Sequence, residues 1–175
     1  ASATGTTFGG VVGGTTALTS LGVTGTANLN GGGITTTGAQ TYQQLTLGAN
    51  ATLASTGSGA VTFNGAVGAV SGQTLTVNTA GATLFNAAVS GLGALTTDAA
   101  GTNTLAADTQ TSGNITLNGA TTLSGAARAL TSTAGSVTLG GTVNGATDLT
   151  LSSATGSTLS GLVGGTTALN SLTIA

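Results

Sequence analysis

The 175-residue chain contains no Pro, Cys, Met, Trp, His, Lys or Glu. Only four of its residues are charged: Arg128, Asp98, Asp108 and Asp148. General acid and base catalysis needs titratable groups that lie together, and binding to a nucleic acid needs several cationic side chains to neutralise phosphates. We therefore expect neither an enzyme nor a nucleic-acid-binding protein, and we assign no catalytic residue.

Further absences narrow the class of protein. No apolar run is long enough for a transmembrane helix, and three Phe and one Tyr are too few for the aromatic girdles of an outer-membrane barrel. The Gly-Gly pairs lack the regularly placed Asp of calcium-binding repeats, so we expect no metal and no cofactor. The first ten residues show no secretory signal sequence.

What the chain does contain is 40 Thr and 32 Gly, with single aliphatic residues spaced among them. Its mean hydropathy of +0.43 and its net charge of −2 differ from the low hydropathy and high charge of disordered chains. Threonine and valine, which are branched at Cβ, suit strands, and without Pro nothing interrupts the backbone hydrogen bonds of a sheet. The composition indicates an ordered, all-β protein.

Internal repeats occur on two scales. Residues 1–24 match residues 152–175, with GGTTAL identical at 13–18 and 164–169, which is an offset of 151 residues. We interpret residues 1–175 as one solenoid segment, an excerpt of a tandem array with this period. A shorter repeat has an apolar residue and, four places later, a Val. Its copies are Phe8 with Val12, Phe63 with Val67, Phe85 with Val89, Leu139 with Val143 and Leu159 with Val163.

The short repeat predicts one coil of a right-handed parallel β-helix, with roughly 8–9 coils of about 20 residues each. In the sequence Leu75-Thr76-Val77, alternation puts the aliphatic side chains inward and the Thr outward. An antiparallel or trimeric β arrangement is the alternative, but it does not explain the recurrence. We expect Asn and Gly to form the coil corners, with stacked Asn side chains hydrogen-bonded between coils. These corner residues are Asn64, Gly65, Asn86, Asn118, Gly119, Asn144 and Gly145.

The isolated polar residues have simple interpretations. Asp98 and Asp148 are expected at solvent-facing turns or strand edges. Arg128 is expected to be a solvated surface residue, with pairing to an Asp or contact with another fibre as alternatives. Tyr42 lies in the least regular region, next to Gln40, Gln43 and Gln44, where we expect a turn insertion that forms a small protrusion rather than a binding site.

Several phrases resemble the repeats of giant bacterial adhesins of the filamentous-haemagglutinin kind. They are GGTTAL, TTGAQTY at 36–42, VTFNG at 61–65 and LTVNTAG at 75–81. The resemblance covers nearly the whole chain and implies a right-handed parallel β-helix, exported to the extracellular space or the bacterial cell surface. In that family the shaft holds a binding tip away from the cell, so any host ligand would bind outside this segment.

Three functions remain open at this point. The first is the structural shaft of an adhesin or extracellular filament that assembles with itself end to end. The second is a sheath or surface-layer protein, because rods with little charge can pack side by side. The third is a Thr-rich solenoid that binds ice or another surface. The last requires Thr pairs in every coil, and from the sequence we expect Thr76 and Thr150 to align while neighbouring coils vary.

Overall fold

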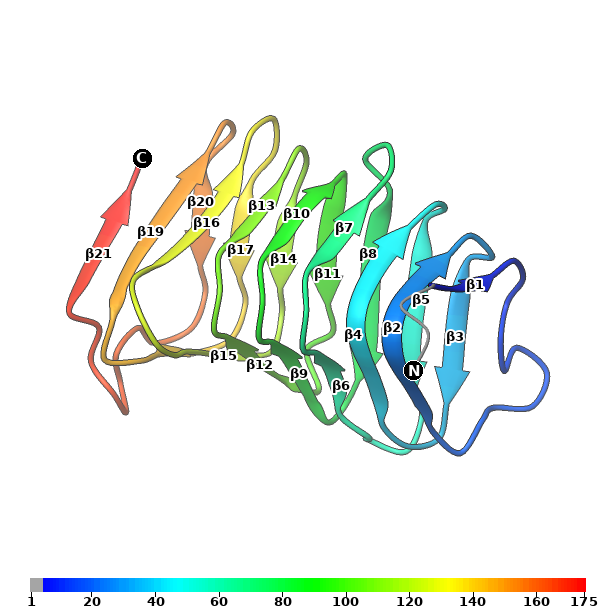
Figure 1. Ribbon diagram of the computed structural model, residues 1–175. Coiled ribbons are helices and arrows are strands. Elements are labelled where there is room, and N and C mark those ends of the chain that lie inside the picture. The colour runs from blue at the N-terminus through cyan, green and yellow to red at the C-terminus, as the bar shows by residue number, and fades with distance from the viewer. Residues whose placement is uncertain (1–4) are drawn as a thin grey trace.

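The structure is a computed structural model that describes residues 5–175. These residues form a parallel β-solenoid of about 8 turns with about 21 residues per turn, and they contain no helix. The turns stack along one axis, with the first strand at one end of the rod and the last at the other (Figure 1). At about 4.8 Å per turn the rod is about 40 Å long. The expected parallel β-helix and its coil length are confirmed.

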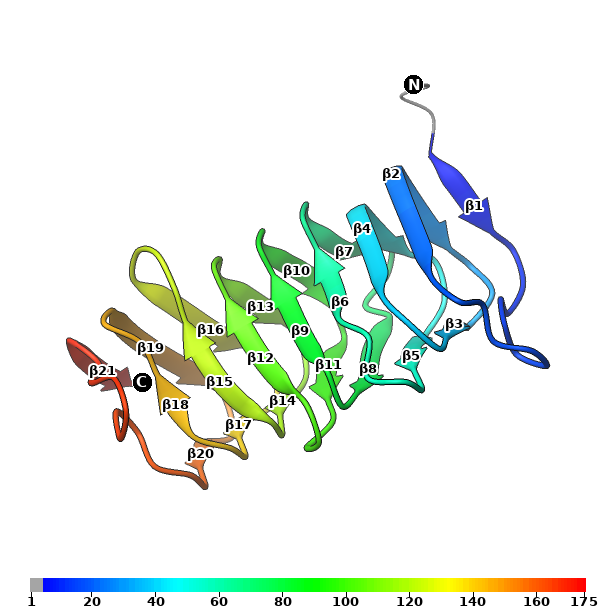
Figure 2. The same cartoon turned by 90° about the horizontal axis from the view of Figure 1, so that it is seen from below.

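Each turn has three strand positions, which give the rod three faces (Figure 2). Faces 1 and 2 belong to one 14-stranded sheet, because β2 and β4 bend around the corner between them. Face 3 is a separate 7-stranded sheet. Every strand pair is parallel to its neighbour one turn away, as alternation and spacing predicted.

The strands are assigned to the faces as follows. Face 1 holds residues 21–23 of β2 (Leu21–Leu29), residues 40–42 of β4 (Gln40–Leu47), β6 (Val61–Phe63), β9 (Ala82–Phe85), β12 (Thr102–Leu105), β15 (Ala120–Leu123) and β18 (Val143–Asn144). Face 2 holds β1 (Thr6–Phe8), residues 27–29 of β2, residues 45–47 of β4, β7 (Val67–Ala69), β10 (Val89–Leu92), β13 (Thr109–Thr111), β16 (Arg128–Ser132), β19 (Asp148–Ser153) and β21 (Ser171–Ile174). Face 3 holds β3 (Gly33–Thr36), β5 (Ala51–Ser55), β8 (Thr74–Thr79), β11 (Ala94–Thr97), β14 (Ile115–Leu117), β17 (Val137–Leu139) and β20 (Ser157–Leu159).

The core is a set of columns in which one side chain per turn stacks on the equivalent side chain of the next. On face 3, Leu75 pairs in register with Leu95, then with Ile115, then with Val137, and all four are buried. Stacking of this kind buries each aliphatic residue against the turns above and below, so stability is built up by contacts between neighbouring turns.

The Asn and Gly residues expected at the corners do lie there, but few of them have the left-handed backbone that we expected. Of the Asn and Gly residues assigned to corners, only Gly145 has a backbone φ in the region that favours glycine, at 145°. Gly65 is required for a different reason, because a Cβ there would collide with the carbonyl oxygen of Gln43 in the turn below. The expected Asn ladder has one rung, in which Asn86 Nδ2 donates to Asn64 Oδ1 at 3.1 Å.

The short sequence repeat marks corners rather than one fixed place in the coil. Phe63 and Phe85 lie on face 1, whereas Leu139 and Leu159 lie on face 3. The prediction that all copies occupy the same place in the coil is therefore wrong. The spacing of the repeat is simply the distance between the last inward residue of one strand and the first inward residue of the next, and it recurs at all three corners.

The alternation predicted that threonine side chains face outward, but in the structure some of them face the core. Several Thr side chains point inward near corners, and their hydroxyls donate to backbone carbonyls that no strand pairs. Thr36 donates to Gly38 O and Thr79 to Gly59 O, at 2.6 and 2.7 Å. Since Thr has nearly the shape of Val, it can fill a core position while it satisfies a corner carbonyl. The buried Thr residues are Thr36, Thr79, Thr83, Thr97, Thr109, Thr111, Thr121 and Thr147. Among them, the hydroxyls of Thr97 and Thr109 have no hydrogen-bond partner in the described part of the chain.

Candidate functional surfaces

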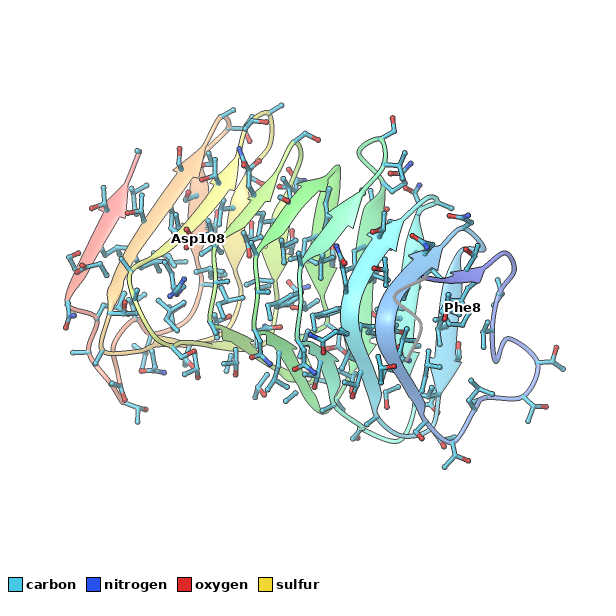
Figure 3. All side chains as sticks on the ribbon, viewed as in Figure 1. Phe8 and Asp108 are labelled. Atoms are coloured by element: carbon cyan, nitrogen blue, oxygen red, sulfur yellow. The ribbon has the colours of Figure 1, made fainter. Side chains whose placement is uncertain are left out.

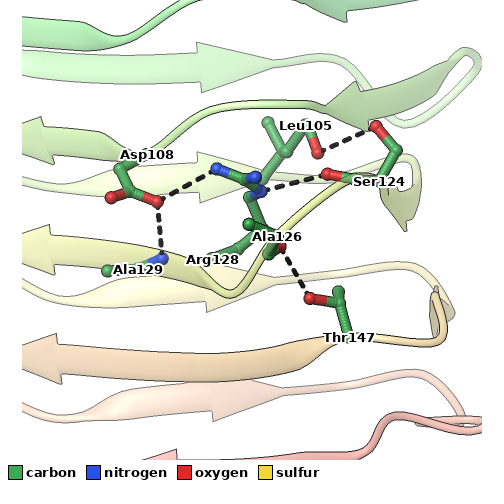
Figure 4. Close-up of polar contacts among 7 residues, drawn as sticks. All are labelled: Leu105, Asp108, Ser124, Ala126, Arg128, Ala129 and Thr147. Carbon is green, nitrogen blue, oxygen red and sulfur yellow. Dashed lines mark hydrogen bonds and ion pairs between the residues drawn. The ribbon is translucent and has the colours of Figure 1, made fainter.

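Two of the four charged residues, Arg128 and Asp108, meet on the corner between faces 1 and 2 (Figure 4). Arg128 NH1 lies 3.4 Å from Asp108 Oδ1 in the preceding turn, and its Nε donates to Ser124 O at 3.1 Å. The Arg128 side chain is only 10% exposed, so the expectation of a solvated residue is wrong and the alternative of pairing with an Asp is confirmed. The corner between β15 and β16 is one residue longer than the equivalent corner between β12 and β13 in the preceding turn, and Arg128 lies at its end.

Asp98 and Asp148 lie apart from this pair. Asp98 follows the last residue of β11 and is half-buried, whereas Asp148 begins β19, is exposed and accepts a hydrogen bond from Ser171 Oγ at 2.7 Å. Their assignment to turns and strand edges is confirmed. Within residues 5–175 no group of three potential metal-binding side chains comes together.

Tyr42 and Gln40 form a buried polar pair, which the sequence did not predict. Both side chains are fully buried on face 1, so the interpretation as a protruding turn insertion is wrong for them. Tyr42 Oη donates to Gln40 Oε1 at 2.7 Å, and Gln40 Nε2 donates to Ala54 O at 2.8 Å. Gln43 and Gln44 are exposed, as expected, at the bend of β4.

The Tyr42 ring continues into a column of aromatic side chains on face 1. Tyr42 stacks on Phe63 with ring centroids 5.7 Å apart, and Phe63 stacks on Phe85 at 5.0 Å. All three rings are fully buried. Burial in this column raises the pKa of the Tyr42 hydroxyl, since the charged phenolate would lose its hydration there. Nothing in this arrangement opens toward solvent, so the cluster is structural.

The outer surface of face 3 bears one continuous column of threonines. In six successive turns a Thr stands at the same outward position, in direct register with the next: Thr52, Thr76, Thr96, Thr116, Thr138 and Thr158. Thr76 does not align with Thr150, which lies on face 2, so the expected alignment is wrong and the neighbouring turns do not vary. The column two residues earlier is mixed, and only Thr74 completes a Thr pair across face 3.

Both ends of the rod present unpaired strand edges and apolar side chains. At the C-terminal end, Leu172 and Ile174 of β21 are 40% and 57% exposed. At the N-terminal end, a depression of about 540 Å³ is lined by Phe8, Leu21, Val23 and neighbouring residues. Phe8 stands beside it at the open edge (Figure 3). Open edges of this kind can pair with further strands of another copy.

The described part of the chain contains no helix that is long and apolar enough to cross a bilayer. Comparisons with protein-family models, curated protein sequences and solved structures return no match.

Proposed function

We propose that this chain is a segment of the structural shaft of a secreted or surface-displayed bacterial adhesin or extracellular filament, which extends by end-to-end continuation of the solenoid. The observation that supports this most strongly is the pair of open ends, where apolar residues such as Ile174 stand exposed at a strand edge. A rod whose ends can accept further turns, and whose sides carry almost no charge, is suited to span distance rather than to bind a small molecule.

The resemblance to filamentous-haemagglutinin-like repeats agrees with this function. So does the absence of any cluster of titratable groups in residues 5–175 other than the ion pair of Arg128 and Asp108. On this view the partners of the segment are further copies of itself, and recognition of a host or surface ligand lies elsewhere in the full protein.

The test is a change in fibre length on cells that display the native protein. Deletion of one period of the long repeat should shorten the projecting fibre by about 35 Å, since it removes between seven and eight turns of about 4.8 Å each. Gold-labelled antibodies against residues 5–175 should mark the fibre on intact cells. Label confined to the cell interior, or a fibre of unchanged length, would refute the shaft.

A second candidate function is supported by the threonine column of face 3, which could bind an ordered surface such as ice. Hydroxyls in register along six turns repeat at about 4.8 Å, as a lattice-matching surface requires. The mixed neighbouring column weighs against it. Thermal hysteresis measured on residues 1–175 separates the two functions: the shaft predicts none, and hysteresis that Thr96→Lys abolishes would favour surface binding.

A further inference from the structure

The two copies of the long repeat lie on different faces of the rod. Residues separated by 151 positions are equivalent in sequence, and three such pairs near the two ends of the structure show how the copies are placed. The pairs are Phe8 and Leu159, Val12 and Val163, and Leu21 and Leu172. Their local structure is also equivalent, because Gly13 and Gly164, which follow the second pair, have φ of 73° and 71°.

In every pair the second member lies one face further around the rod than the first. Phe8 belongs to β1 on face 2, whereas Leu159 belongs to β20 on face 3. Val12 bridges to Ile34 on face 3, whereas Val163 bridges to Val143 on face 1.

The third pair shows the same shift. Leu21 pairs with Gln40 on face 1, whereas Leu172 pairs with Leu149 of β19 on face 2. Since all three pairs shift in the same direction by one face, one local distortion cannot be the cause.

The number of turns per repeat explains the shift. Starting at Leu21, seven register steps along face 1 lead to Val163, and one more corner leads to Leu172. One period of the long repeat therefore occupies seven turns and a third of another, which agrees with about 21 residues per turn.

We propose that the two ends of this segment are docking surfaces for further copies of the same repeat, and that each copy is rotated by one third of a turn about the rod axis relative to the copy before it. This rests on the tandem repetition in the proposed shaft, and on no other part of its function.

The N-terminal end fits the preceding copy. In the depression there, Phe8, Leu21 and Val23 are the equivalents of Leu159, Leu172 and Ile174. Those three residues cover the turn below them in register, and the residues that they cover are Leu139, Leu149 and Leu151. The same three leucines of a preceding copy would fill the depression, so the junction between copies already occurs within this chain.

The C-terminal end fits the following copy. Ile174 is 57% exposed, whereas its equivalent Val23 is 8% exposed because the strand of Tyr42 pairs with it in the next turn. A second copy would place its own Tyr42 strand over Ile174 and bury it. The occupant of this end is thus the segment of the next copy that begins at Gly25.

Because each copy is rotated by one third of a turn, an equivalent surface points in a different direction in each successive copy. The threonine column of face 3 in one copy would continue on face 1 in the next copy and on face 2 in the third. Three copies and 22 turns restore the original orientation. No single flat threonine surface then runs along the whole shaft, and contacts made by any face are offered in three directions.

A two-copy chain tests the offset: residues 1–175 followed directly by a second copy of residues 25–175. The chain has no native Cys, so any disulfide that forms must join the engineered cysteines. Because Gly22 pairs with Thr41 in the first copy, Thr173, the equivalent of Gly22, should lie opposite the second copy's Thr41. Adjacent parallel strands are about 4.8 Å apart, within reach of a disulfide.

Two outward-facing pairs distinguish the arrangements. The variant with Thr173→Cys and Thr41→Cys in the second copy should form a disulfide in most of the protein, seen as a mobility shift on a non-reducing gel. The variant with Leu162→Cys and Ala39→Cys in the second copy should show no shift, because those exposed residues would meet only if the strand of Tyr42 in the second copy stacked on face 1, as in an unrotated repeat. Thr150→Cys with Thr173→Cys, which are in register here, is the positive control.

Each outcome decides the proposal. A disulfide to Thr41 supports the one-third rotation. A disulfide in the variant with Leu162→Cys and Ala39→Cys overturns it in favour of an unrotated repeat. If neither variant forms a disulfide, while the control does and circular dichroism shows full β content, the docking is overturned. All three readouts are independent of whether the native protein is displayed on cells, so failure here is distinct from failure of the shaft.

Discussion

The aromatic column on face 1 gives the sharpest prediction about stability. Phe63 is its central ring, fully buried and stacked on both Tyr42 and Phe85. Phe63→Ala should lower the free energy of unfolding by about 3 to 5 kcal/mol, because it removes the buried ring, leaves a cavity and breaks two stacking contacts. In a chain of this size that corresponds to a loss of roughly 6 to 20 °C in Tm.

The control is Thr62→Ala on the same strand. Thr62 faces outward and is half-buried, so its loss should cost less than about 0.5 kcal/mol. Urea unfolding followed by circular dichroism measures both variants against the parent chain. If Phe63→Ala costs no more than Thr62→Ala, the inward direction of this column and the register of face 1 are wrong.

Four further predictions concern the polar residues. Gln40→Ala should lower the free energy of unfolding in urea by about 2 to 3 kcal/mol, because it leaves the buried Tyr42 hydroxyl without an acceptor. A smaller loss than that caused by Thr62→Ala would argue against this hydrogen bond. Since burial raises the pKa of Tyr42, the stability contributed by its protonated form is complete at neutral pH and is lost as pH rises above the ordinary Tyr value of about 10. Tyr42→Phe should remove this alkaline loss, and an unchanged pH profile would contradict the assignment. Arg128→Ala should lower the free energy of unfolding more than Asp108→Ala does, because the stem of Arg128 is buried whereas the Asp108 side chain is 61% exposed. The ion pair itself contributes about 1 kcal/mol or less. Equal costs of the two substitutions would mean that only the charges matter. Trypsin should leave the folded chain intact and cut the unfolded chain only after Arg128, as mass spectrometry would show; rapid cutting of the native protein would place Arg128 outside the fold.

Much of the fold was predictable because it depends on local patterns. Alternation in Leu75-Thr76-Val77 defined which side of a strand is buried, and the recurrence of the short repeat defined the coil. Both follow from the geometry of stacked parallel strands, in which equivalent side chains of adjacent turns must match. The open ends were predictable for the same reason, since a solenoid has no partner for its first and last turns.

The face of the rod on which each strand lies was not predictable from the spacing of the repeats alone. All three corners have similar lengths, so Phe63 and Leu139 start equivalent motifs on different faces. The threonine column was missed because the sequence distance between its members varies. The step from Thr52 to Thr76 is longer than the step from Thr76 to Thr96, and a comparison at constant offset misaligns them.

The buried polar residues were missed because their partners lie in other turns. Gln40 can be buried since Ala54, which is distant in sequence, accepts a hydrogen bond from its amide. Arg128 can be buried since Asp108 lies one turn below it. Only the register of the turns reveals such contacts, and a single sequence contains no local sign of them.

The chain is a rod of stacked parallel turns, and we propose that this rod continues along one axis in the native protein. Cryo-electron microscopy of the native fibre tests it most directly. We expect a single rod with an axial repeat of about 4.8 Å. Rods joined along their sides would indicate a sheath instead of a shaft, and a fibre without the 4.8 Å repeat would contradict the solenoid itself.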